Sequence, residues 1–155
     1  MEIKLRVAEA KDCPQILALI NELAVYERAP EQVTVDLEHF IDSGFGKNPV
    51  WKAYVAEADN KVIGFALFYT RYSTWKGCRL YLEDFIVTEE YRGKGVGKIL
   101  FEKVIEESKN GNYHGMVWQV LDWNEPAINF YNKYNATLES GWLNAALSTE
   151  QVKAF

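Results

Sequence analysis

The sequence predicts a single α/β (α+β) domain that spans residues 1–155. Two observations lead to this prediction. Along the whole chain, segments with the apolar pattern of strands, either alternating or continuous, take turns with segments of helical spacing. The chain contains no repeat, no low-complexity tract and no linker. A chain of 155 residues also has the length of one domain and is long enough to bury a core of its own.

The N-terminal part predicts a strand followed by a helix. Apolar residues alternate with polar ones over residues 3–7, which is typical of a half-buried strand. Asp12 is expected to cap the next helix, and Gln15 stands at the position that completes a capping box. Apolar residues then recur on one helical face, and the helix is expected to end near residues 26–28, before Pro30.

The middle of the chain predicts a weaker helix and three strands. The helix covers residues 34–43 and is stopped by two glycines that follow closely. Strands are expected at residues 51–58, 62–72 and 80–87, and a short hairpin turn joins the first two.

The last third of the chain is harder to interpret. A strand is expected at residues 115–121, and Asn124 is expected to cap a helix that has Pro126 in its first turn. Asn135 stands where a left-handed residue would end that helix. We expect a last strand at residues 141–147.

A glycine-rich turn follows the predicted strand at residues 80–87. Gly93, Gly95 and Gly97 remove side chains from this turn, and a helix begins inside it. Such a helix start presents unpaired N–H groups and a positive dipole end, which suit phosphate oxygens. The P-loop and dinucleotide patterns do not fit, because Lys98 is followed by Ile and the glycine spacing is wrong for both. The pattern Arg-x-x-Gly-x-Gly at residues 92–97 therefore predicts an anion-binding turn, and the alternative is a tight turn that only connects strand and helix.

Composition and charge limit the classes of partner that we expect this protein to bind. Hydrophobic residues make up 48% of the chain, charged residues 25% and aromatic residues 14%. The net charge is −5 and no block of Lys or Arg stands out, so we expect neither nucleic acid nor an anionic membrane as a partner. A cationic small molecule is easier for such a protein to attract.

The sequence offers no metal site and no disulfide framework. Cys13 and Cys78 are far apart in sequence, and neither belongs to a C-x-x-C pair. His39 and His114 lie near no motif, so we expect them on the surface. Because no signal peptide and no apolar run of about 20 residues is recognisable, we expect a reduced, cytoplasmic protein.

Five motifs together resemble one known family. They are Leu23–Glu27, Asp42–Gly46, Tyr81–Phe85, Tyr91–Gly97 and Trp123–Tyr131. The chain resembles the GNAT superfamily of N-acetyltransferases, and within it the diamine (spermidine/spermine) N1-acetyltransferases and their thialysine-acetylating relatives. The resemblance implies a mixed, mostly antiparallel sheet with helices on both faces, and a cofactor cleft where neighbouring strands splay apart. It also implies acetyl transfer from acetyl-CoA to a primary amine, in a homodimer.

The resemblance assigns catalytic roles to two residues. Tyr131 matches the family tyrosine that protonates the CoA sulfur; a phenol has a reference pKa near ~10 and is protonated at neutral pH. Its alternative role is core packing beside Phe130. Glu83 matches the acid that binds the substrate ammonium or accepts its proton, through water. Asp84 is adjacent in the same strand, so it is expected to point to the opposite face. Two roles remain open for it: contact with the substrate, or satisfying backbone groups at a strand irregularity.

The resemblance also assigns binding residues. The cofactor is expected to contact Phe85, Ile86 and Val87 through the backbone, the turn residues Arg92, Gly93, Lys94, Gly95, Val96 and Gly97, and on its other side Asn124, Glu125, Pro126, Ala127 and Tyr131. The substrate is expected to contact Tyr26, Glu27, Glu83, Val117, Trp118 and Gln119. Alternative roles exist for several of these residues. Tyr26 and Glu27 could form a solvated helix end, residues 117–119 could belong to a buried strand, and residues 124–127 could cap a helix.

One departure bears on the substrate. The polyamine enzymes have an acid directly before a Gly-Trp pair, whereas this chain has Ser140 there and Glu139 one residue earlier. Three hypotheses follow. The protein is a diamine or polyamine acetyltransferase, an acetyltransferase of another small amine such as thialysine, an amino acid or an aminoglycoside, or a non-catalytic CoA-binding module.

Overall fold

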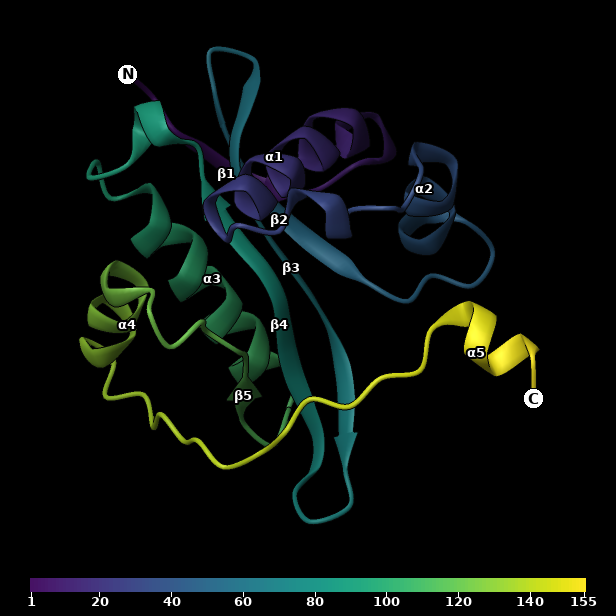
Figure 1. Cartoon of the computed structure of the whole chain (residues 1–155). Coiled ribbons are helices and arrows are strands. Elements are labelled where there is room, and N and C mark those ends of the chain that lie inside the picture. Colours follow the sequence, from purple (N-terminus) through teal and green to yellow (C-terminus); the bar gives the residue numbers. More distant parts are fainter. The chain divides into compact units, whose positions relative to one another are not determined.

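The computed structural model describes all 155 residues, and they form two compact units (Figure 1). The first unit covers residues 1–119 and the second residues 120–155.

The first unit is built on one sheet of five strands in the order β1-β2-β3-β4-β5. The strands are β1 (Lys4–Val7), β2 (Lys52–Ala58), β3 (Lys61–Ser73), β4 (Gly77–Val87) and β5 (Met116–Val117). The pairs up to β4 are antiparallel, and β4 and β5 are parallel. The predicted mixed, mostly antiparallel sheet is confirmed, although the strand expected at residues 115–121 is only two residues long.

Helices cover both faces of this sheet. On one face, α1 (Cys13–Tyr26) and α2 (Leu37–Phe45) bury a cluster in which Ile16 and Phe40 pack with residues of β2, β3 and β4. On the other face lies α3 (Val96–Asn110), whose Phe101 ring is 5.7 Å from the ring of Phe85 on β4. We call these the α1 face and the α3 face. Three short 3-10 turns connect the elements: η1 (Ala10–Asp12), η2 (Pro30–Gln32) and η3 (Glu89–Tyr91).

The capping prediction for α1 is wrong. Asp12 directly precedes the helix, but its buried carboxylate accepts hydrogen bonds from Arg6 (2.7 and 2.9 Å) and from the Glu9 N–H (2.7 Å). Hydrogen bonds from Arg6 lower the pKa of Asp12, so it stays ionised, and Arg6 also pairs with Glu57 on β2. Gln15 does not complete a capping box, since its Oε1 accepts from the Val62 N–H (2.9 Å). Both side chains instead tie the start of α1 to the sheet.

The second unit contains two helices, α4 (Glu125–Asn132) and α5 (Thr149–Lys153). Asn124 caps α4 as predicted, because its Oδ1 accepts from the Ala127 N–H (3.3 Å). Asn135 has φ 57°, the left-handed conformation that the sequence predicted. The strand expected at residues 141–147 is wrong: these residues are exposed and pair with no strand.

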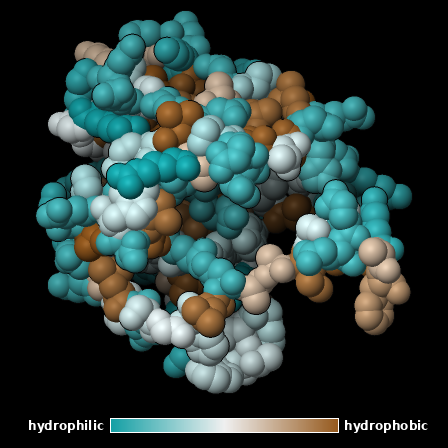
Figure 2. All heavy atoms as spheres, in the orientation of Figure 1, coloured by the Kyte–Doolittle hydropathy of each residue, from teal (hydrophilic) through white to brown (hydrophobic).

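The surface mixes polar and apolar residues, and apolar side chains are scattered among polar ones on the face that Figure 2 shows. His39 and His114 are exposed, as predicted. Both cysteines are free, Cys13 buried and Cys78 exposed. None of the helices combines the length and the apolar character that a bilayer crossing requires.

Candidate functional site

The glycine-rich turn has the geometry of an anion-binding loop. Gly93 and Gly95 have φ of +74° and +83°, a conformation that favours glycine, and a Cβ on either would meet nothing within 4 Å. Gly95 occupies the N-cap of α3, with no side chain capping the helix. The N–H groups of Val96, Gly97 and Lys98 lack partners within the helix and stand at its positive end. The turn is therefore open above an uncapped 15-residue helix.

This turn is fixed against the end of β4. A Cβ on Gly97 would lie 3.6 Å from the ring of Phe85 and 3.9 Å from the Val87 side chain, so the start of α3 packs closely on the strand. Arg92 donates from Nε to the Val87 carbonyl (2.8 Å) and lies 3.7 Å from the Glu22 carboxylate. Its guanidinium also stands 5.5 Å from the ring centroid of Tyr26. Arg92 thus links the turn to the end of α1.

The sheet opens beside the same strand. β5 pairs with β4 only at Leu80 and Tyr81, so the two strands separate after Tyr81. The Val87 carbonyl accepts from Arg92, whereas the next residue, Thr88, donates its N–H to Ile63 on β3. The backbone of β4 near its end therefore offers groups on the side away from β3, where the sheet is open.

A β-bulge in β4 changes the direction of the two acids. Leu67 pairs with Asp84 and Phe68 pairs with Leu82, so Glu83 is an extra residue without a partner on β3. Asp84 therefore shares the α1 face with Leu67. The Glu83 carboxylate accepts from the Tyr69 hydroxyl (2.9 Å), and Tyr69 lies two residues from Leu67 on that face. The prediction that Glu83 and Asp84 point to opposite faces is wrong, because the bulge interrupts the alternation of the strand.

The bulge brings together acids from two distant motifs. Burial raises the pKa of Asp84 to about 6, and the negative charges of Glu83 and Glu27 add to this shift. Burial also raises the pKa of Glu27 at the end of α1. We call Glu27, Glu83 and Asp84 the acidic cluster. Such a cluster can bind an ammonium group, and a carboxylate with a pKa near 6 can accept its proton at neutral pH.

Two tyrosines flank the acidic cluster. Burial, and then the hydrogen bond to Glu83, raises the pKa of Tyr69 to about 12, so its hydroxyl remains a donor. Tyr81 pairs with Tyr69 across the strands, and their ring centroids are 5.3 Å apart. Burial also raises the pKa of Tyr81. These side chains form a polar wall next to the acids.

The remaining predicted substrate residues lie in different surroundings. Tyr26 is exposed, beneath the Arg92 guanidinium. Val117 ends β5, and the half-buried Trp118 packs its ring edge-on against Phe101 of α3, with centroids 5.4 Å apart. Gln119 is exposed at the end of the first unit.

The second unit holds the other predicted residues. Asn124, Glu125, Pro126 and Ala127 form the cap and first turn of α4. Tyr131 lies one to two turns further along the same helix and is buried, with its ring centroid 5.6 Å from that of Phe130. The capping role of Asn124 is established by its hydrogen bond.

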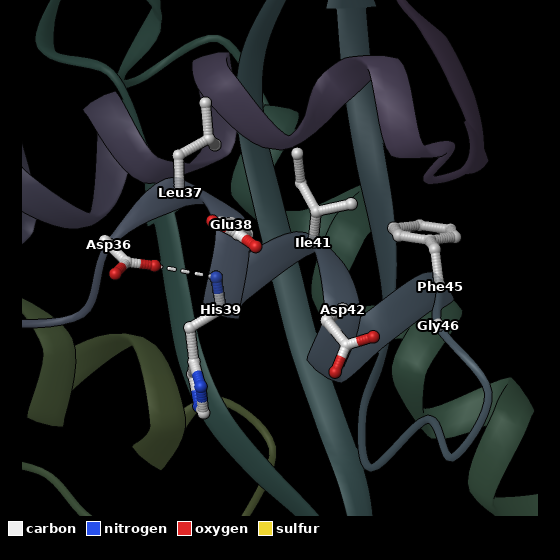
Figure 3. A pocket seen from close by; sticks show the side chains of 8 residues that line it. All are labelled: Asp36, Leu37, Glu38, His39, Ile41, Asp42, Phe45 and Gly46. Carbon is white, nitrogen blue, oxygen red and sulfur yellow. Dashed lines mark hydrogen bonds between the residues drawn. The ribbon is translucent and has the colours of Figure 1, made fainter.

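A surface hollow lies elsewhere, along α2. It is lined by Asp36, Leu37, Glu38, His39, Ile41, Asp42, Phe45 and Gly46, and Figure 3 shows that these side chains come from one helix and its two ends. The one hydrogen bond drawn among them is the helix cap, in which the Asp36 carboxylate accepts from the His39 N–H (2.7 Å). None of the predicted site residues lines this hollow.

The sequence interpretation missed part of the site. Asp84 was expected on the wrong face, and Tyr69 was assigned no role. The signal for Asp84 was present, because a second acid beside Glu83 in an apolar strand is costly unless it has a function. Its direction depends on a one-residue bulge; a strand irregularity at Asp84 was considered, but the residue pattern does not fix its register.

Comparisons with known proteins agree on one family. A model of the acetyltransferase (GNAT) family matches residues 14–136. The chain is 36% identical to a thialysine N-epsilon-acetyltransferase of Mus musculus, over 97% of this chain and 95% of that protein, and 38% identical to the Bos taurus protein of the same name, over 90% and 89%. It is 35% identical to the human spermidine/spermine N(1)-acetyltransferase-like protein 1, over 90% of this chain but 21% of that longer protein.

Solved structures show the same fold. An integron cassette protein of V. cholerae superposes with a TM-score of 0.78 at 19% identity, covering 99% of this chain and 97% of that one. An aminoglycoside acetyltransferase from a soil metagenome gives 0.76 at 19% identity, covering 94% and 95%. At such identities these likenesses concern the fold alone.

Proposed function

Because the chain belongs to the GNAT family of acetyltransferases, we propose that it transfers the acetyl group of acetyl-CoA to the terminal amine of thialysine or a closely similar small amine. Support for the substrate comes from relatives named thialysine N-epsilon-acetyltransferases, which match this chain over at least 89% of their own length. These relatives favour thialysine over the diamines that the sequence motifs alone suggested.

One observation carries the proposal: the acidic cluster and the uncapped start of α3 flank the same few residues of β4. Asp84 stands three residues before Val87, which is about 10 Å along a strand. The helix start packs against Val87 and Phe85, and the acids lie on the opposite face of the sheet. An anionic cofactor above the turn and a cationic amine at the acids would meet across the open edge of β4.

The chemistry assigns complementary roles to these groups. The amine must lose a proton before its nitrogen attacks the thioester carbon, and Asp84 or Glu83 would accept that proton, directly or through water. As the carbon–sulfur bond breaks, the leaving thiolate needs a proton, which we assign to the Tyr131 phenol. The turn at residues 92–97 would hold the cofactor, with no metal.

A diamine or polyamine is the second candidate substrate. The acidic cluster suits any ammonium, and the human relative carries a spermidine/spermine name. The acid that the polyamine enzymes have before Gly-Trp is replaced here by Ser140, which removes one partner for a distal amine. We also propose that the protein works in the cytoplasm as a homodimer.

The test is a competition between amines. Purified protein is given acetyl-CoA with thialysine, spermidine or putrescine, and kcat/KM is measured for each. The proposal expects the highest value for thialysine. A higher value for spermidine would favour the second candidate, and no release of CoA with any amine would favour a non-catalytic CoA-binding module.

A further inference from the structure

Two arginines face each other beside the acidic cluster. Arg71 on β3 pairs directly with Arg79 on β4, near the tip of the long β3–β4 hairpin in Figure 1. The next pair on the same face is Tyr69 with Tyr81, and the Tyr69 hydroxyl binds Glu83. The arginine pair therefore lies on the α1 face, on the far side of the tyrosines from the acids.

Neither arginine has an acidic partner. Side-chain oxygens of Asp or Glu lie within 4 Å of other cations of the chain, but of neither Arg71 nor Arg79. The Arg71 guanidinium stands 5.3 Å from the Tyr81 ring centroid. The Nε of Arg79 is shielded from solvent and has no hydrogen-bond acceptor. Like charges directly opposite in a sheet destabilise it, and a shielded donor without an acceptor adds to that cost.

The surroundings leave room for the Arg79 guanidinium. Gly115 lies beside it, and a Cβ on that residue would stand 3.4 Å from Nη2. Gly115 has φ +91°, so glycine is favoured there on conformational grounds as well. An anion between the two guanidinium groups would supply the missing acceptor and relieve their repulsion, and a carboxylate matches the planar fork of arginine.

We propose that Arg71 and Arg79 bind the carboxylate of the acceptor substrate, which makes it an ω-amino acid rather than a diamine. This inference rests on the proposed acetyl transfer to a small amine and goes further by naming the residues that select the substrate. Along one face the wall runs from the acidic cluster, past Tyr69 and Tyr81, to the arginine pair. Asp84 is paired with Leu67, about 13 Å from Arg71 along β3, whereas Tyr69, whose hydroxyl binds Glu83, is only about 7 Å from Arg71. A short chain with its amine at Glu83 and its carboxylate at the arginines therefore spans this row.

The experiment compares thialysine with its decarboxylated analogue, 2-(2-aminoethylthio)ethylamine, in the whole protein. The two amines share the reacting end and differ only by the carboxylate. Arg71→Gln and Arg79→Gln are each expected to lower kcat/KM for thialysine about ten- to a hundredfold, the effect of losing a charge-assisted hydrogen bond. For the diamine the same variants are expected to keep or raise kcat/KM, because a repelling cation is removed. The expected result is thus a reversal of the preference for thialysine over the diamine, and a merely structural role of the arginines would not produce it.

Lys76→Gln serves as the matched control, since Lys76 is an exposed cation on the same hairpin, outside the row. Lys76→Gln is expected to change kcat/KM for neither amine. Thermal melting checks that all variants fold. Isothermal titration of both amines in the presence of CoA reports binding independently of turnover. Equal loss on both amines, or no loss on thialysine, would overturn the carboxylate site while leaving the proposed function standing. A wild type that neither binds nor acetylates thialysine would overturn both.

Discussion

Asp84 is a residue whose environment differs from that of an ordinary surface carboxylate. The bulge turns it to the α1 face, where burial and two neighbouring acids raise its pKa from 3.8 to about 6. A raised carboxyl pKa means that the folded chain binds more protons than the unfolded chain between pH ~4 and ~6, so this group lowers stability as pH rises through that window.

We therefore predict that Asp84→Asn stabilises the protein at pH 7.5 by about 1–2 kcal/mol and has no effect near pH 4. Denaturant unfolding at both pH values measures the difference. Asp59→Asn is the control, because Asp59 is an exposed turn residue outside the acidic cluster. An equal effect of Asp84→Asn at both pH values would contradict the assignment. The same variant should lose acetyl transfer if Asp84 accepts the amine proton.

Tyr131 is the second residue whose role can be isolated. If its phenol protonates the leaving thiolate, Tyr131→Phe should lower kcat about 10²- to 10⁴-fold and leave the KM for acetyl-CoA nearly unchanged. Tyr134→Phe is the matched control, one turn further along the same segment. Comparable losses in both variants would mean that packing, and not proton donation, explains the effect of Tyr131.

Among the elements, the turn between β4 and α3 carries the cofactor prediction. Gly95→Ala adds only backbone strain at φ +83°, whereas Gly95→Asp adds the same strain and a negative charge at the helix start. We predict that Gly95→Asp raises the KM for acetyl-CoA at least about tenfold above that of Gly95→Ala. The KM for the amine should change little. If the two variants had the same KM for acetyl-CoA at low salt, the anion-binding turn would be excluded.

Elements with a strong residue pattern were predicted closely. The helix α1 and the strands β2, β3 and β4 lie within a few residues of their expected bounds, because apolar spacing and flanking turn residues define them. The turn at residues 92–97 was found for the same reason: its glycines are a local feature. Those parts of the candidate site that lie within one local motif could therefore be predicted from the residue pattern.

Features that depend on pairing were not predictable. The bulge at Glu83 arises from the register between β3 and β4. A strand irregularity at Asp84 was one alternative, but the residue pattern of β4 fits an unbroken strand equally well. β5 ends at Val117 although apolar residues continue to Leu121, because only Leu80 and Tyr81 pair with it. Residues 141–147 have the apolar character of a strand but no partner edge, so local pattern alone gave the wrong element there.

At the scale of the whole molecule, exposed apolar residues gather in the C-terminal segment. Trp142, Leu143 and Leu147 are 82%, 93% and 71% exposed. Side chains of this size are rarely left in water together unless a partner covers them. The homodimer that the family resemblance implied would give them such a partner.

We predict that the protein sediments as a dimer and that Trp142→Asp shifts it towards the monomer, because a charge in an apolar interface costs several kcal/mol. Sedimentation equilibrium over a range of concentrations measures the change in the dissociation constant. Trp75→Asp is the matched control: Trp75 is 81% exposed, but it lies in the β3–β4 hairpin turn. A wild type that stays monomeric at every concentration would contradict the prediction. Equal weakening by both substitutions would mean that the effect is not specific to the C-terminal segment.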